Sequence, residues 1–410
     1  MSFKHGVYTS EVPSSLLAPS QNESGLPVII GTAPVNLGDP TCINVPQLVY
    51  TYEEATEIFG YSDDWEKYTL CEFIYSQFAL YGQAPCVLIN VYDPAKHNNN
   101  PASVTKADII GGYDSNTNKY TGLELVNQVF PKFRLIPGLI GCPKWSEDSE
   151  VAAVMRTKAA SVSGIFKCSA VVDIPSGAGG ADQYGEVSAW KTSHNYTDTR
   201  EIVCWPRVKL GDKVFHMSTQ LIGLMNSTDN EHDDVPFKSP SNELLQMDSC
   251  VNANNEEILL TLEQANYLNS QGVVTALNWT GGWRAWGNRT GAYPANTDAK
   301  DVFIAVRRMM DFLSNTFITT FWQEADAPMN ARLIRTIVNS FNLYLNSLVA
   351  REMLLGGRVE FREDENAMTD LLNGVLKFHI FITPPMPAEV IEGIFEYDPQ
   401  YLSVLYEALS

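Results

Sequence analysis

The chain has 410 residues, of which 45% are hydrophobic and 11% aromatic. A chain of this size can bury roughly three quarters of its unfolded surface, which excludes disorder as its main state. Its 48 acidic residues outnumber its 28 basic ones and give a formal net charge of −20. Because nucleic acids are polyanions, this charge argues against a nucleic-acid-binding protein.

Residues 1–15 contain no apolar stretch of the kind that a secretion signal requires, and no apolar run approaches the ~18 residues of a membrane span. We therefore expect a chain made in the cytosol, without direct membrane contact. The seven cysteines are an odd number, occur singly and fall mostly within apolar stretches. They are expected to be reduced thiols in the core.

Residues 1–25 are polar and contain several prolines, with a period-2 stretch around Val7, Tyr8 and Thr9 that predicts an arm with strand potential. Short β-rich runs then alternate with helix-like segments. Turn-forming residues gather over 93–118, so we expect a domain boundary near residue 95, with residues 26–95 before it and a middle domain over 96–276 after it. The expected strands are 28–30, 86–91, 133–136, 168–174, 202–205 and 273–277, and the expected helices are 51–59, 68–81, 151–162 and 184–191.

Past residue 277, apolar residues recur at three- and four-residue steps and predict two long amphipathic helices. A strand over 375–382 follows and ends at two prolines. We assign 277–390 to a C-terminal domain and 391–410 to a C-terminal arm, in which 391–397 is strand-like. The whole pattern predicts a mixed α/β (α+β) fold with several domains and extended strand arms at both termini.

The sequence contains few patterns that indicate a catalytic, metal-binding or phosphate-binding site. The six histidines are scattered, and the one dense group, Asp229 with 231–234, is either a hard-cation site or a solvated part of a surface loop over 227–241. The glycine-rich stretch 177–180 lacks the Lys-Ser/Thr of a phosphate loop, and no G-x-S-x-G motif occurs. No catalytic residue, metal ion or cofactor is predicted. An α/β enzyme with an unrecognised site stays as an alternative.

Arginines concentrate in one window. Residues 284–362 carry ten basic and seven acidic residues, and nine of the ten are Arg. Arg suits buried or interfacial ion pairs, so this window is either a salt-bridged surface within one chain or a surface that faces acidic neighbours. The strand-like arms at both ends are unpaired edges that could add to a neighbour's sheet, which indicates self-assembly.

The segment Trp286-Gly287-Asn288-Arg289-Thr290, preceded by Gly272 to Thr275, resembles a signature of the contractile-tail sheath proteins of myophages and phage-tail-like bacteriocins. Further segments are similar to that family in the expected order: 5–11, 28–33, 51–60, 134–138, 306–311, 330–335 and 374–389. The resemblance therefore covers nearly the whole chain. The sequence departs from the family pattern around 231–236. In this region of the chain, only the following residues, 239–242, still resemble the family.

The resemblance implies a non-catalytic virion subunit that stacks as hexameric rings around a tail tube and, when the baseplate triggers it, contracts and drives the tube through the target envelope. Its partners would be further copies of itself, the tail tube protein, and the baseplate and tail terminator proteins. It would be assembled in the host cytoplasm into the contractile tail. The resemblance also implies that 26–95 and the C-terminal domain 277–390 together form an inner domain nearest the tube, and that the middle domain 96–276 lies outside. Another self-assembling virion or tube subunit is a second alternative.

The same resemblance implies that arms are exchanged between adjacent subunits. The candidate strand-exchange residues are Val7, Tyr8, Thr9, Ile391, Ile394 and Phe395. Our hypothesis is that Arg332 and Arg335 face the tube, with Arg307 and Arg308 at the same or another interface. Trp286, Gly287, Asn288, Arg289 and Thr290 are assigned to packing of the fold or between subunits.

Overall fold

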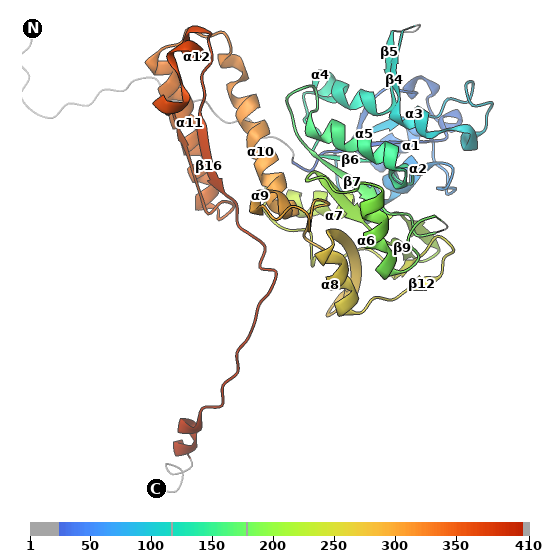
Figure 1. The fold of residues 1–410 in the computed structure, drawn as a ribbon. Coiled ribbons are helices and arrows are strands. Elements are labelled where there is room, and N and C mark those ends of the chain that lie inside the picture. Colours follow the sequence, from blue (N-terminus) through green and yellow to red (C-terminus); the bar gives the residue numbers. More distant parts are fainter. Residues whose placement is uncertain (1–23, 116–117, 178, 405–410) are drawn as a thin grey trace, which may run out of the picture.

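A computed structural model describes residues 24–115, 118–177 and 179–404 (Figure 1). Val7, Tyr8 and Thr9 of the expected N-terminal arm lie outside the described residues. The described chain has the expected mixed α/β, multi-domain fold. An α/β body contains most of the chain, a helical part stands beside it, and the C-terminal segment extends away from both (Figure 1).

The body is built on an eight-stranded sheet with the order β14-β13-β8-β7-β6-β1-β3-β2. The six central strands run parallel, while β2 and β14 pair antiparallel at the two edges. Every residue of β1, β3 and β7 is buried, so both faces of the sheet centre are covered. The strands are β1 (Pro27–Gly31), β2 (Gln47–Val49), β3 (Cys86–Asn90), β6 (Leu139–Gly141), β7 (Ser169–Asp173), β8 (Glu201–Cys204), β13 (Val273–Trp279) and β14 (Gly282–Trp286).

Helices α2 and α7 contact each other and pack on the central strands. Helix α5 also packs on β6 and β7, and α3 contacts α5. Several helices begin with a side-chain cap; Thr51, for example, accepts the backbone N–H of Glu54 at the start of α1. The body helices are α1 (Tyr52–Phe59), α2 (Thr69–Ile74, continued by a π-helical turn Tyr75–Leu80), α3 (Lys106–Ile110), α4 (Val129–Phe133), α5 (Ser149–Ala160), α6 (Tyr184–Ser193), α7 (Met217–Asn230) and α8 (Leu262–Ser270).

Two smaller sheets project from the body. A four-stranded antiparallel sheet has the order β10-β9-β11-β12, and β4 with β5 forms a separate hairpin (Figure 1). Their strands are β4 (Gly112–Asp114), β5 (Lys119–Thr121), β9 (Arg207–Leu210), β10 (Lys213–Phe215), β11 (Ser249–Val251) and β12 (Glu257–Ile258).

The helical part has its own hydrophobic core. Helix α10 begins in the core of the body with Ile304 and continues from Met309 onward in the second core, which α11 and β15 complete. Phe317 and Phe341 meet edge-to-face at its centre with ring centroids 5.2 Å apart. The elements are α9 (Ala299–Val302), α10 (Ile304–Phe321), α11 (Ala331–Ala350), β15 (Gly356–Glu360), α12 (Met368–Leu372) and β16 (His379–Thr383), followed by a 3-10 turn Pro399–Ser403.

The structure divides the chain differently from the sequence-based boundaries. The boundary expected near residue 95 falls within one sheet, because β1 pairs with both β3 and β6. The boundary at 276/277 falls inside β13. Strand order depends on pairing between distant segments, which turn-forming residues between them do not reveal. Helix α10 contributes residues to both hydrophobic cores.

Several local predictions also need correction. Residues 133–136 form no strand: α4 ends at Phe133, Arg134 adopts a left-handed conformation, and β6 begins only at Leu139. A short apolar run of this kind does not distinguish a helix from a strand. Residues 227–230 belong to α7 rather than to a surface loop, and β15 was not expected. The strand-like residues 391–397 are extended without pairing in this single chain.

All seven cysteines are buried and have no disulfide partner, and burial raises the pKa of their thiols. Within the described residues, no helix has the length and apolar content needed to cross a membrane.

Candidate functional site

The segment Trp286–Thr290 begins with the last residue of β14 and connects the large sheet to the helices around it. The indole N–H of Trp286 donates to Oδ1 of Asn266 in α8 at 2.8 Å, and the backbone N–H of Asn288 donates to Oδ1 of Asn269 at 3.0 Å. Thr290 Oγ1 donates to the carbonyl of Asp301 at 2.7 Å, just before α10. These hydrogen bonds join the sheet edge, α8 and the start of the helical part.

Gly287 within this segment has φ +145°, a region that favours glycine. A Cβ built on it would lie 2.8 Å from Cα of Val274 in the neighbouring strand β13. The close approach of two backbones therefore requires glycine at this position.

Arg289 lies between two aromatic rings. Its guanidinium carbon is 4.5 Å from the ring centroid of Tyr293 and 4.2 Å from that of Phe303. Its Nε–H donates to Oε1 of Glu389 at 3.1 Å, and a second N–H donates to Oε2 of the same carboxylate. This bidentate pair joins the segment after β14 to a residue one hundred positions later in the chain.

Arg307 and Arg308 have partners within the chain. Arg308 is 5% exposed and forms a bidentate ion pair with Asp229, which is 1% exposed and belongs to α7. Arg307 pairs with Asp301 at 2.9 Å and with Asp311 at 2.7 Å. Both arginines therefore form salt bridges within one chain, which is the first of the two alternatives given above for the arginine-rich window 284–362. Asp229 also accepts a hydrogen bond from Ser24, so its oxygens are occupied by protein donors.

Arg332 and Arg335 are exposed and lie one turn apart at the start of α11. Asn330 caps this helix by accepting the backbone N–H of Leu333 at 3.0 Å. The buried face of α11 carries Ile337 and Phe341. Neither arginine forms an ion pair within the part of the chain that the structure describes, so both guanidinium groups are available to a partner.

The C-terminal arm is almost fully exposed. Ile391 and Ile394 are 89% and 88% exposed, and Phe395 is 99% exposed. In Figure 1 this segment runs away from β16 and ends in the short C-terminal turn. The single chain therefore leaves these apolar side chains in water.

The sheet β15-β16 has two strands. On the outer side of β15, the side chain of Asn342 in α11 accepts the N–H of Val359 at 2.9 Å and donates to its carbonyl at 3.1 Å. The other edge, along β16, pairs with no further strand in the described residues. A groove of about 470 Å³ lies over this sheet, lined by Met310, 356–358 and 380–383.

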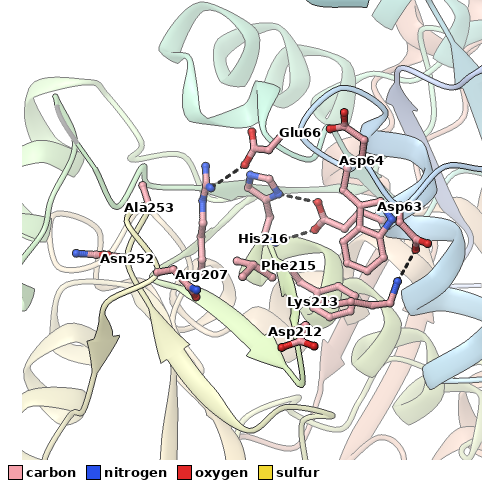
Figure 2. Close-up of a pocket in the computed structure, with 14 residues that line it drawn as sticks. Asp63, Asp64, Glu66, Arg207, Asp212, Lys213, Phe215, His216, Asn252 and Ala253 are labelled. Carbon is pink, nitrogen blue, oxygen red and sulfur yellow. Dashed lines mark hydrogen bonds and ion pairs between the residues drawn. The ribbon is translucent and has the colours of Figure 1, made fainter.

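A cavity of about 540 Å³ lies between the four-stranded sheet and the loop before α2 (Figure 2). His216 donates from Nδ1 to Glu72 at 2.8 Å. Burial alone would lower the pKa of His216, but the charge of Glu72 and this hydrogen bond outweigh it and raise the pKa to about 9. Arg207 pairs with Glu66 and Glu147, each at 3.2 Å.

The other cation at the cavity, Lys213, pairs with Asp63 at 2.5 Å (Figure 2). These ion pairs connect β9 and β10 to the loop before α2. The pair between His216 and Glu72, which reaches α2 itself, is buried. Among the described residues, no group of three or more His, Cys, Asp or Glu side chains could hold a metal ion.

Comparison with known proteins adds to this geometry. No family model matches the chain. The tail sheath protein of Burkholderia phage BcepMu is 26% identical over 313 residues, or 74% of this chain. The tail sheath protein of Escherichia phage P2 is 24% identical over an alignment that covers 100% of this chain and 99% of that protein. The chain is thus similar in sequence to the tail sheath proteins of two phages. Neither of these two relatives is named as an enzyme.

This chain spans 64% of the length of the BcepMu sheath protein, less than two thirds of it. Solved sheaths share the fold. The PVC extracellular contractile injection system sheath, in its contracted state, has a TM-score of 0.69 at 16% identity and covers 98% of this chain and 99% of its own. The contracted helical sheath of the anti-feeding prophage has a TM-score of 0.68 at 17% identity, with 96% and 99% covered.

Sequence reasoning found the segment 286–290 and the exposed arginines, but it missed the partner of Arg289 and the open edge of β16. The sequence signal for the partner of Arg289 was Glu389 itself, an acidic residue in the proline-rich segment that follows the last strand.

Proposed function

We propose that the chain is the subunit of a contractile tail sheath. Copies stack as hexameric rings around a tail tube, and the lattice shortens and drives the tube through the envelope of a target cell. Similarity to two phage tail sheath proteins and to sheaths solved in the contracted state supports this proposal. The partners are the tube protein, the baseplate and the tail terminator, in a tail assembled in the host cytoplasm.

The observation that carries the proposal is the exposed C-terminal arm. In an extended segment, Ile391, Phe395 and Tyr397 fall on one face, and Ile394 falls on the other face between Glu392 and Glu396. The first face is therefore the apolar one. Such a face is unfavourable in water and becomes stable when a second sheet covers it. In the sheath, a neighbouring copy provides that sheet.

The recipient of the exchanged arm is the open edge of β16. An added strand would pair its backbone with Ile380 and Ile382 and would place side chains over the groove beside Phe381. Asn342 already occupies the edge of β15 at Val359, which favours β16. The N-terminal arm with Val7, Tyr8 and Thr9 is proposed to be exchanged as well.

Arg332 and Arg335 are proposed to face the tube from the start of α11. The C-terminal part of the chain, with the early strands of the large sheet, would lie nearest the tube, and the middle of the chain would lie outside. The proposal does not include Arg307 and Arg308, whose charges are neutralised within the chain. Contraction would then exchange one set of subunit contacts for another while the shared strands keep neighbours connected.

Negative-stain electron microscopy of the purified chain at moderate salt tests the proposal. We expect hollow striated cylinders, and a small particle that does not polymerise when concentrated would contradict a sheath. A variant with Ile391→Asp and Phe395→Asp should remain folded but fail to polymerise. The matched control, Glu392→Gln with Glu396→Gln, changes the other face of the same strand and should polymerise normally. A different filament shape would favour another self-assembling tube or shell subunit.

A further inference from the structure

The root of the C-terminal arm is held at one point. Among residues 384–397, Glu389 is the residue that hydrogen-bonds to the body in the described part of the chain. Before it, Pro384 is buried behind the end of β16. After it, Val390 and Ile391 are already 82% and 89% exposed. The change from held to free chain therefore occurs at Glu389.

The socket for Glu389 is built by the body. Arg289 is stacked between Tyr293 and Phe303, so its planar group is oriented before the carboxylate arrives. The side chain of Arg289 is 15% exposed, and both oxygens of Glu389 accept its N–H groups. Asn269 of α8 approaches the same carboxylate at 3.5 Å. A bidentate, partly buried pair of this kind fixes direction as well as distance.

We propose that the Arg289–Glu389 pair is an anchor that sets the pivot of the exchanged C-terminal arm, so that a second copy of the chain receives the arm from a fixed origin. This inference rests on the proposed sheath function. Arg289 then acts as a positioning residue for assembly, and two segments of the family resemblance, 286–290 and 384–389, form the two halves of one contact.

The length of free chain gives the anchor its effect. Residues 390–404 could span roughly 50 Å when extended, and freeing residues 384–389 as well would add roughly 20 Å. A longer and undirected tether lowers the effective concentration of the arm at its acceptor and raises the entropy lost on docking. Without the anchor, exchange should weaken although no residue of the strand itself has changed.

A charge exchange tests the anchor in the full chain. We expect Glu389→Arg to lower the fraction of polymerised protein about tenfold at a fixed concentration, the scale of losing hydrogen bonds between charged groups. Arg289→Glu should do the same, and the double variant should restore most of the assembly. The matched control reverses the exposed pair Lys377–Asp370, which precedes β16 and should assemble normally.

A second measurement follows the anchor directly. Because all seven native cysteines are buried, Met386→Cys can carry a spin label selectively. Met386 lies between the buried Pro384 and Glu389, so its label should move more freely in the Glu389→Arg variant before any assembly. Unchanged mobility would overturn the anchor. Increased mobility with normal assembly would overturn its role in exchange. If the native chain does not polymerise, the sheath proposal fails, while the mobility result still decides whether the anchor exists.

Discussion

The ion pair between Arg308 and Asp229 provides the clearest test of how the helical part is held to the body. Both side chains are almost completely buried, at 4% and 1% exposure, and they connect α10 to α7. Asp229→Asn keeps the shape of the side chain but leaves the buried guanidinium of Arg308 without a counter-charge. Removing one partner of a buried pair costs about 3–5 kcal/mol, because the other charge stays desolvated.

The control is Asp233→Asn. Asp233 pairs with Arg351 at 3.0 Å, but the two side chains are 69% and 39% exposed, so water screens the pair and its loss should cost less than ~1 kcal/mol. Urea unfolding of the dilute, unassembled chains measures both values. If Asp229→Asn costs no more than Asp233→Asn, the buried pair does not hold α10, and an interface role for Arg308 becomes the better explanation.

Three further predictions concern other parts of the molecule. Since the pKa of His216 is raised to about 9 from a usual 6.5, its protonation stabilises the fold below pH 6.5, and this stability is lost as pH rises toward 9. In the His216→Gln variant, the urea concentration at the midpoint of unfolding should therefore depend less on pH between 6.5 and 9. Gly287→Ala should destabilise the chain by about 3 kcal/mol or more because its Cβ meets backbone, whereas Gly356→Ala, which meets nothing within 4 Å, should change little; equal melting temperatures would refute this reasoning. Arg332→Glu with Arg335→Glu should leave melting unchanged and reduce co-sedimentation with purified tail tubes, and normal co-sedimentation would remove both from the tube interface.

The sequence was sufficient for elements whose signal is local. Apolar runs such as 28–30 and 86–91 became the buried strands β1 and β3, and the three- and four-residue apolar steps became α10 and α11. The same reasoning failed at 133–136, where an apolar stretch contains a helix end instead of a strand. Short segments take their structure from the neighbours they pack against, and those neighbours are distant in the sequence.

At the candidate site, too, the sequence determined some features and only the tertiary structure decided others. Sequence alone determined that arginine concentrates in one window, that an apolar period-2 segment lies near the C-terminus, and that the chain resembles sheath proteins from end to end. Only the tertiary structure decided which arginines are available. Arg308 meets Asp229 from 79 positions away and is neutralised, while Arg332 meets no acid within the described residues. Charge neutralisation depends on distances of a few ångströms between chain segments, and no spacing along the sequence specifies those distances.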